Sequence, residues 1–69
     1  MWFMDILLNQ KIFIVKNNTS LTDLLTQIDV DTKYIAIEVN EVIIPKSKYY
    51  NYFLKDDDKV EIITAVGGG

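Results

Sequence analysis

The sequence predicts an α+β fold, in which a small mixed sheet of about five strands carries one main helix, residues 21–28, across one face. Three observations support this prediction. The 69 residues suffice for one domain with a modest core, since a chain of this length buries only about 60% of the surface it exposes when unfolded. Short segments rich in Val and Ile alternate as strands do. A single segment has apolar residues at helical spacing.

The first half of the chain predicts two strands and then the helix. Residues 4–15 alternate in two short runs, with a turn at Asn9 and Gln10. Ser20 begins the helix, because its hydroxyl can accept the N–H of Asp23 and a carboxylate suits the positive end of a helix. The apolar stripe that would lie on the sheet comprises Leu21, Leu24, Leu25 and Ile28.

The second half predicts three strands. Residues 34–39 alternate again, and a turn at Asn40 and Glu41 leads into a short strand, residues 42–44. Residues 59–66 form the last strand, and the connection through the helix is long enough to join parallel neighbours. This order indicates a β-grasp arrangement with the first and last strands central and parallel. We expect a β-grasp domain over residues 1–64 and a flexible glycine tail over 65–69.

The composition argues against several classes of function. Cys, His and Arg are absent, which excludes disulfides, Cys/His metal sites, thiol nucleophiles and His acid–base catalysis. All seven cations are Lys and the net charge is −3, which argues against nucleic-acid binding. The chain lacks a signal peptide pattern and an apolar run of about 20 residues, so we expect a cytoplasmic protein that does not cross a membrane.

Two polar segments each have a functional and a structural interpretation. Asp56, Asp57 and Asp58 could bind a hard cation, but a solvated turn is the favoured reading, so we expect no metal site. The aromatic cluster of residues 49–53 is interleaved with lysines and could stack nucleic-acid bases. We favour instead a loop that closes one end of the core.

The glycines are the most informative feature. All three stand at the C-terminus, as Gly67, Gly68 and Gly69, so no glycine-rich phosphate loop is present. A tail without Cβ atoms is narrow enough to enter the active site of another protein. There the carboxylate of Gly69 could be adenylated by ATP and then converted by a sulfur nucleophile to a thiocarboxylate. On this hypothesis the chain is a carrier rather than an enzyme, and all catalysis lies in its partners.

The chain resembles the ubiquitin-like sulfur carriers, and within them the ThiS type of thiamin thiazole biosynthesis. The resemblance covers nearly the whole chain from Met4. Residues 4–9 resemble the opening strand of the family. Residues 39–46 resemble its pattern V-N-G-E-x-V-P-R, and residues 54–62 resemble L-x-D-G-D-x-V-E-I. The tail A-V-G-G-G matches the family's C-terminus. Gln10, Glu41 and Asp57 depart from the family by replacing turn glycines.

The resemblance implies partners and roles for individual residues. A ThiF-type adenylyltransferase would use Mg-ATP to adenylate Gly69, a cysteine persulfide would supply sulfur, and a ThiG-type thiazole synthase would take it. The carrier itself would bind no cofactor. Val66, Gly67 and Gly68 would occupy the partner channels. An apolar sheet face would dock beside the tail, with Phe53 and Ile63 as candidate docking residues.

Other functions remain open at this point. The small subunit of molybdopterin synthase uses the same terminal thiocarboxylate, but its members tend to be longer and lack the pattern of residues 39–46. A ubiquitin-like protein modifier would instead form an isopeptide bond through Gly69. A plain interaction module would function without the last two glycines.

Overall fold

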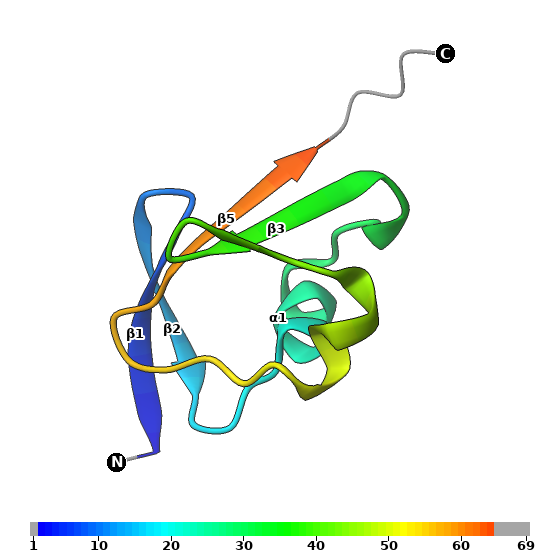
Figure 1. Cartoon of the computed structure of the whole chain (residues 1–69). Coiled ribbons are helices and arrows are strands. Elements are labelled where there is room, and N and C mark those ends of the chain that lie inside the picture. The colour runs from blue at the N-terminus through cyan, green and yellow to red at the C-terminus, as the bar shows by residue number, and fades with distance from the viewer. Residues whose placement is uncertain (1, 65–69) are drawn as a thin grey trace.

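Five strands and one α-helix make up residues 2–64, the part of the chain that the computed structural model describes (Figure 1). The predicted fold class is confirmed, and the helix has the predicted bounds. The elements are β1 (Phe3–Leu8), β2 (Lys11–Lys16), α1 (Leu21–Ile28), β3 (Ile35–Val39), β4 (Val42–Ile44) and β5 (Lys59–Thr64), with two 3-10 helices, η1 (Thr32–Tyr34) and η2 (Lys46–Asn51).

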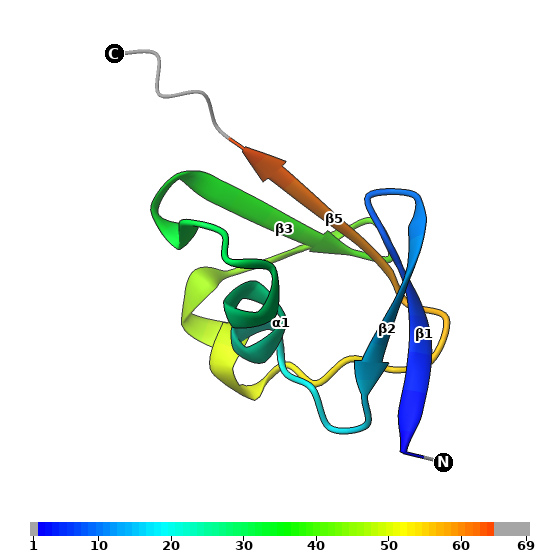
Figure 2. The ribbon, with the colours of Figure 1, turned by 180° about the vertical axis from the view of Figure 1, so that it is seen from behind.

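The last strand lies at the centre of the sheet, whose order is β2-β1-β5-β3-β4. β5 is parallel to β1 and antiparallel to β3, so the predicted parallel pairing of the first and last strands is confirmed. The connection through α1 does not join neighbours, contrary to expectation. It links β2 to β3, and β1 and β5 lie between them (Figures 1 and 2).

Both hairpin turns lie where the sequence predicts them, and both adopt left-handed backbone conformations. The φ angles are 49° and 70° at Asn9 and Gln10, and 52° and 70° at Asn40 and Glu41. Two consecutive residues with positive φ are typical of the type I′ turn, whose twist matches that of paired strands. Asn tolerates this conformation, whereas a residue such as Gln or Glu adopts it at a cost of about 1–2 kcal/mol.

A capping box fixes the start of α1. The Ser20 hydroxyl accepts the N–H of Asp23 at 3.1 Å, and the Asp23 carboxylate accepts the N–H of Ser20 at 3.2 Å. The helix ends at Asp29, which is left-handed with φ 56°. Within residues 2–64, no helix combines the length and apolar character needed to span a membrane.

The core lies between α1 and one face of the sheet, here called the helical face. The stripe Leu21, Leu24 and Leu25 is buried there, which stabilises an otherwise marginal short helix. Alternate strand residues form the other face, here called the open face, because side chains in a strand alternate between faces. The buried residues of the helical face are Ile6, Val15, Ile35, Ile37, Val39, Ile44 and Val60.

One segment differs from the sequence prediction, and another extends beyond the described residues. Tyr34 belongs to η1 rather than to the third strand, because the Asp31 side chain accepts the N–H of Lys33 at 2.9 Å and caps this turn. The last strand was predicted over residues 59–66, and β5 is described over Lys59–Thr64, with residues 65 and 66 outside the described part.

Candidate functional site

The predicted reacting group lies just beyond the described end of β5. Gly69 and the predicted channel residues Val66, Gly67 and Gly68 are outside residues 2–64. What the structure describes is the root of this segment, the strand Lys59–Thr64, and the sheet surface beside it. Figure 1 shows that the end of β5 and the start of β1 lie at opposite ends of the described fold.

Asn9 fastens β5 on the side of β1. Its backbone N–H donates to the carbonyl of Val60 at 2.9 Å. Its side-chain Oδ1 accepts the N–H of Ile62 at 2.8 Å, and its Nδ2 donates to the carbonyl of the same residue at 3.4 Å. Since β1 ends at Leu8, this carboxamide takes the place of a further strand residue. Within the described residues, the strand that pairs with β5 at Ile63 and Thr64 is β3.

A polar network fastens the start of β5 from the other side. Asn40 accepts the N–H of Lys59 at 3.0 Å and donates to the Asp58 carboxylate at 2.9 Å. That carboxylate also accepts the N–H of Lys55 at 2.8 Å, and Asp58 is buried. The solvated-turn interpretation of the three aspartates is therefore wrong for Asp58, whose carboxylate organises the loop. In the described chain, no group of three or more acidic, His or Cys residues is placed to hold a metal ion.

The two candidate docking residues lie on different parts of the molecule. Ile63 is 46% exposed on the open face of β5, opposite Ala36 of β3. Phe53 is 52% exposed, but it lies in the loop that bridges to Ser20, before α1. The structure thus does not bring these two residues together on one strand or loop. Both docking assignments remain predictions.

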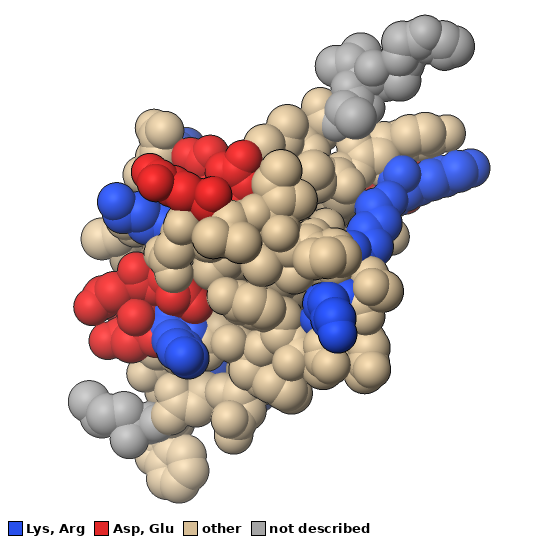
Figure 3. Space-filling model, in the orientation of Figure 1, with Lys and Arg blue, Asp and Glu red and all other residues tan. Residues whose placement is uncertain are grey.

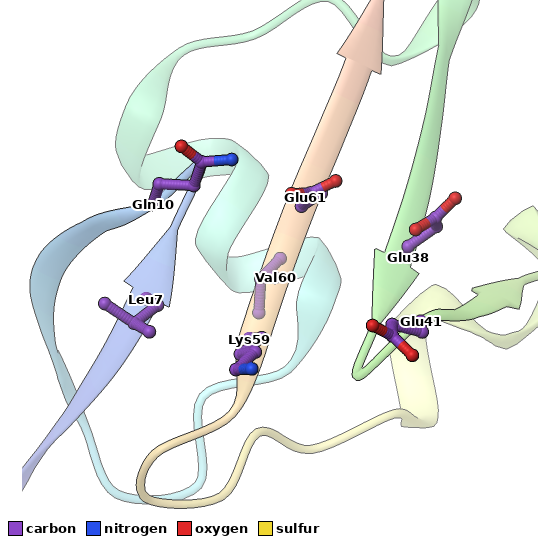
Figure 4. A pocket seen from close by; sticks show the side chains of 7 residues that line it. All are labelled: Leu7, Gln10, Glu38, Glu41, Lys59, Val60 and Glu61. Carbon is purple, nitrogen blue, oxygen red and sulfur yellow. The ribbon is translucent and has the colours of Figure 1, made fainter.

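The open face carries a hollow of about 470 Å³ that sequence reasoning missed. Figure 4 looks onto it, with α1 behind the sheet. Glu38 and Glu61 stand directly opposite one another on neighbouring strands. Strand parity places both on one face, but only the register of β3 against β5 makes them neighbours, and no sequence signal gives that register. The lining residues are Leu7, Gln10, Glu38, Glu41, Lys59, Val60 and Glu61.

The charges of the described residues are unevenly distributed. Figure 3 shows acidic side chains gathered on the side where the β3–β4 turn and the loop preceding β5 lie. Lysines stand beside them there and are also present on the other side, where no acidic patch is visible in this view. A local excess of one charge steers the approach of charged partners.

The tyrosine-rich segment, residues 49–53, contributes two of its tyrosines to the core. Tyr49 is buried in the core and Tyr52 packs against it, so the prediction of a segment closing the core is confirmed for these two. Burial raises the pKa of Tyr49 above 10, and the backbone of Ile37 partly opposes the rise. Burial also raises the pKa of Tyr52, as does the nearby charge of Asp58. Tyr50 is exposed.

A family model, a known protein and a solved structure each match this chain under the name ThiS. The model of the ThiS family matches residues 3–69. The sulfur carrier protein ThiS of Bacillus subtilis is 37% identical over 54 residues, which are 78% of this chain and 82% of that protein. A thiazole synthase of Paramagnetospirillum magneticum is 44% identical over 46 residues, which are 67% of this chain but 14% of the synthase.

A solved structure matches over almost the whole fold. The crystal structure of the thiamine biosynthesis protein ThiS of Geobacter metallireducens superposes with a TM-score of 0.83. The sequences are 28% identical, and the match covers 96% of this chain and 100% of that one.

Proposed function

This chain belongs to the ThiS family, and on that premise we propose that it is a sulfur carrier of thiamin biosynthesis, loaded at the carboxylate of Gly69. The observation that carries the proposal is the extent of the family match, which runs through all three terminal glycines. The Bacillus subtilis relative is named as a sulfur carrier and the Geobacter metallireducens structure as a thiamine biosynthesis protein, which supports the same role.

The loading chemistry needs nothing from this chain but its carboxylate. The carboxylate attacks the α-phosphate of Mg-ATP on a ThiF-type adenylyltransferase, forming an acyl adenylate and releasing pyrophosphate. A partner's cysteine persulfide then attacks the carbonyl and releases AMP, which leaves an acyl disulfide. A second thiol cleaves the S–S bond, forming a protein disulfide and freeing the thiocarboxylate. In this scheme the carrier is a co-substrate, not an enzyme, and binds no cofactor.

We propose a thiazole synthase as the acceptor of the sulfur. In Paramagnetospirillum magneticum, a segment similar to this chain is part of a protein named thiazole synthase. Two activities joined in one polypeptide commonly serve one reaction, so the match supports the same pairing here. Val66, Gly67 and Gly68 would occupy the partner channels, and all these steps would take place in the cytoplasm.

The fold supports this role by holding the root of the tail. Hydrogen bonds from Asn9 and Asn40 secure β5 from both sides, as far as Ile62. The proposed reactive end therefore starts from a fixed strand, and a partner that binds the sheet also sets the position of Thr64. Of the two docking candidates, Ile63 lies next to this strand end, which favours it over Phe53.

Intact mass spectrometry tests the proposal directly. The full chain is incubated with a ThiF-type adenylyltransferase, Mg-ATP and a cysteine persulfide donor. We expect the mass gain of one sulfur replacing one oxygen, lost when ATP is omitted. The matched control is the chain ending at Gly68, which keeps a terminal glycine carboxylate but shortens the reach by one residue.

Two outcomes contradict the proposal. An unchanged mass, with an adenylyltransferase that loads its own carrier, would indicate an interaction module instead. Loading followed by attachment to lysine side chains would indicate a protein modifier. Adding a thiazole synthase or a molybdopterin synthase large subunit to the loaded chain then identifies the acceptor, because only the true acceptor removes the sulfur.

A further inference from the structure

The open face of the sheet has exposed apolar residues and no covering element among residues 2–64. Ile12 and Ile14 on β2 are 72% and 62% exposed, and Ile43 on β4 is 65% exposed. The register places Ile43 beside Glu38, so apolar surface adjoins the acidic hollow on the β4 side. Apolar patches with a polar neighbour are typical of protein interaction surfaces.

The residues that line the hollow carry an excess of negative charge. Its lining contains three carboxylates, those of Glu38, Glu41 and Glu61, and one ammonium, that of Lys59. Like charges directly opposite on neighbouring strands destabilise a sheet. Glu38 and Glu61 are such a pair, and Figure 4 shows both on the open face.

Two residues in strained conformations also line the hollow. Gln10 and Glu41 occupy the second positions of the two hairpin turns, each with φ 70°. Glycine takes this conformation without a Cβ clash, so the turns themselves gain nothing from a side chain there. Both side chains nevertheless line the same hollow, from opposite ends of it (Figure 4). Their presence suits a recognition surface better than a turn.

We infer that the open face docks the adenylating partner, which inserts a Lys or Arg side chain between Glu38, Glu61 and Glu41. This inference rests on the proposed function. An enzyme that binds a nucleoside triphosphate carries cations around that site, so the surface near the entrance for the tail is electropositive. The distance from Glu61 to Thr64, the last residue of β5, is about 10 Å, at 3.3 Å per residue. One enzyme can therefore contact the hollow and hold the tail at the same time. Ile43 and Ile63 contact apolar side chains of the partner that lie around this Lys or Arg.

The test compares two pairs of substitutions that remove the same charge. The first is Glu38→Gln with Glu61→Gln on the open face. The control is Asp29→Asn with Asp31→Asn, on the connection after α1, where Asn keeps both the left-handed conformation and the capping oxygen. The probe is a ThiF-type adenylyltransferase with Mg-ATP. Carrier KM and kcat for pyrophosphate release, and Kd without ATP, are measured at low and high salt.

We expect the Glu38/Glu61 variant to raise the carrier Kd and KM about tenfold, which corresponds to about 1.4 kcal/mol, with kcat unchanged. Its dependence on salt should be weaker than that of the wild type, since fewer charges pair in the complex. Its thermal midpoint should be at or above that of the wild type, because the repulsion between the two carboxylates is gone. The control variant should bind as the wild type does. Glu41→Gly should likewise weaken binding while stabilising the fold.

Each contrary outcome separates the inference from the proposed function. Normal sulfur loading with wild-type Kd and KM in the Glu38/Glu61 variant overturns the docking inference alone. Equal weakening in the control overturns it too, because only the net charge would matter. If the chain binds through these glutamates in a salt-dependent way but is never adenylated, the docking inference holds and the proposed carrier function is overturned. A wild-type chain that neither binds nor is adenylated overturns both.

Discussion

Asn9 and Asn40 occupy the same position in two different turns and perform the same task. Each is the first left-handed residue of its hairpin, and each carboxamide oxygen accepts a backbone N–H of β5, from Ile62 and Lys59 respectively. The positive φ turns the side chain of each back toward the central strand. Asparagine therefore suits each position for two reasons: it tolerates the left-handed conformation, and its amide can form hydrogen bonds with β5 or its neighbours.

Replacing Asn9 by Gly keeps the turn and removes the carboxamide. We expect a loss of about 1–2 kcal/mol in the free energy of unfolding, since each of its hydrogen bonds contributes about 0.5–1.5 kcal/mol. Amide hydrogen exchange at Ile62 should accelerate, because its N–H would lose its partner. The control is Asn18→Gly, which makes the same change at a residue with φ 66° outside β5's hydrogen bonds. Equal exchange rates at Ile62 in both variants would contradict this account.

Replacing Gln10 or Glu41 by glycine should have the opposite effect from Asn9→Gly, because it should stabilise the fold. Gln10→Gly and Glu41→Gly should each raise the free energy of unfolding by about 1 kcal/mol, because glycine relieves the left-handed strain. Urea denaturation measures this. Gln10→Ala and Glu41→Ala retain the Cβ and should not stabilise. Stabilisation by Ala as well as by Gly would point to side-chain repulsion instead of backbone strain.

At the scale of elements, α1 depends on its cap and on the sheet beneath it. Ser20→Ala removes the hydroxyl that accepts the N–H of Asp23, and it should lower the free energy of unfolding by about 1 kcal/mol. Ser47→Ala, at an exposed position in η2, is the matched control and should have little effect. Both are measured by urea denaturation followed by circular dichroism. A smaller loss for Ser20→Ala than for Ser47→Ala would show that the cap is dispensable.

The predictability of each element follows from how local its cause is. The helix and both hairpin turns were predictable, because a cap, a stripe and two asparagines lie within a few residues of what they stabilise. Alternation could not decide which face of β2 is buried, because Phe13 and Val15 are as apolar as Ile12 and Ile14. The 3-10 helix η2 has no period to detect, and its position depends on Tyr49 packing in the core.

The candidate site shows the same difference between features with a local cause and features that depend on distant contacts. The glycine tail is visible in composition alone, and the exposure of Ile63 follows from alternation. The acidic hollow and the contact of Asn9 with Ile62 join residues far apart in the chain. Both depend on the central position and the register of β5, which the local pattern does not contain.

For the whole molecule, alkaline pH is a test of the core. Burial holds the pKa of Tyr49 above 10, so the folded chain retains this proton more tightly than the unfolded chain does. Below about pH 10 the phenol is neutral in both states and the stabilisation is fully present; above it the unfolded chain ionises first and stability falls.

We expect Tyr49→Phe to reduce the slope of the free energy of unfolding against pH above about pH 10. Tyr50→Phe is the matched control, because it removes the same hydroxyl from an exposed ring, so that the difference between the two variants reports the effect of burial. Urea denaturation over a series of alkaline buffers measures both. An unchanged slope in Tyr49→Phe would assign the alkaline loss to other groups, among them Tyr52, whose pKa is also raised.

The central place of β5 has a mechanical consequence. A partner that grips the terminal glycines and pulls would load β5 along its own axis. The hydrogen bonds from Leu7 and Asn9 on one side, and from β3 on the other, lie across that axis. They would therefore be sheared together and not peeled apart one after another, and many weak bonds that must break at once resist force far better than the same bonds in series. The sheet would act as an anchor, so that the end of the chain could be drawn into one active site, released and offered to another while the domain stays folded.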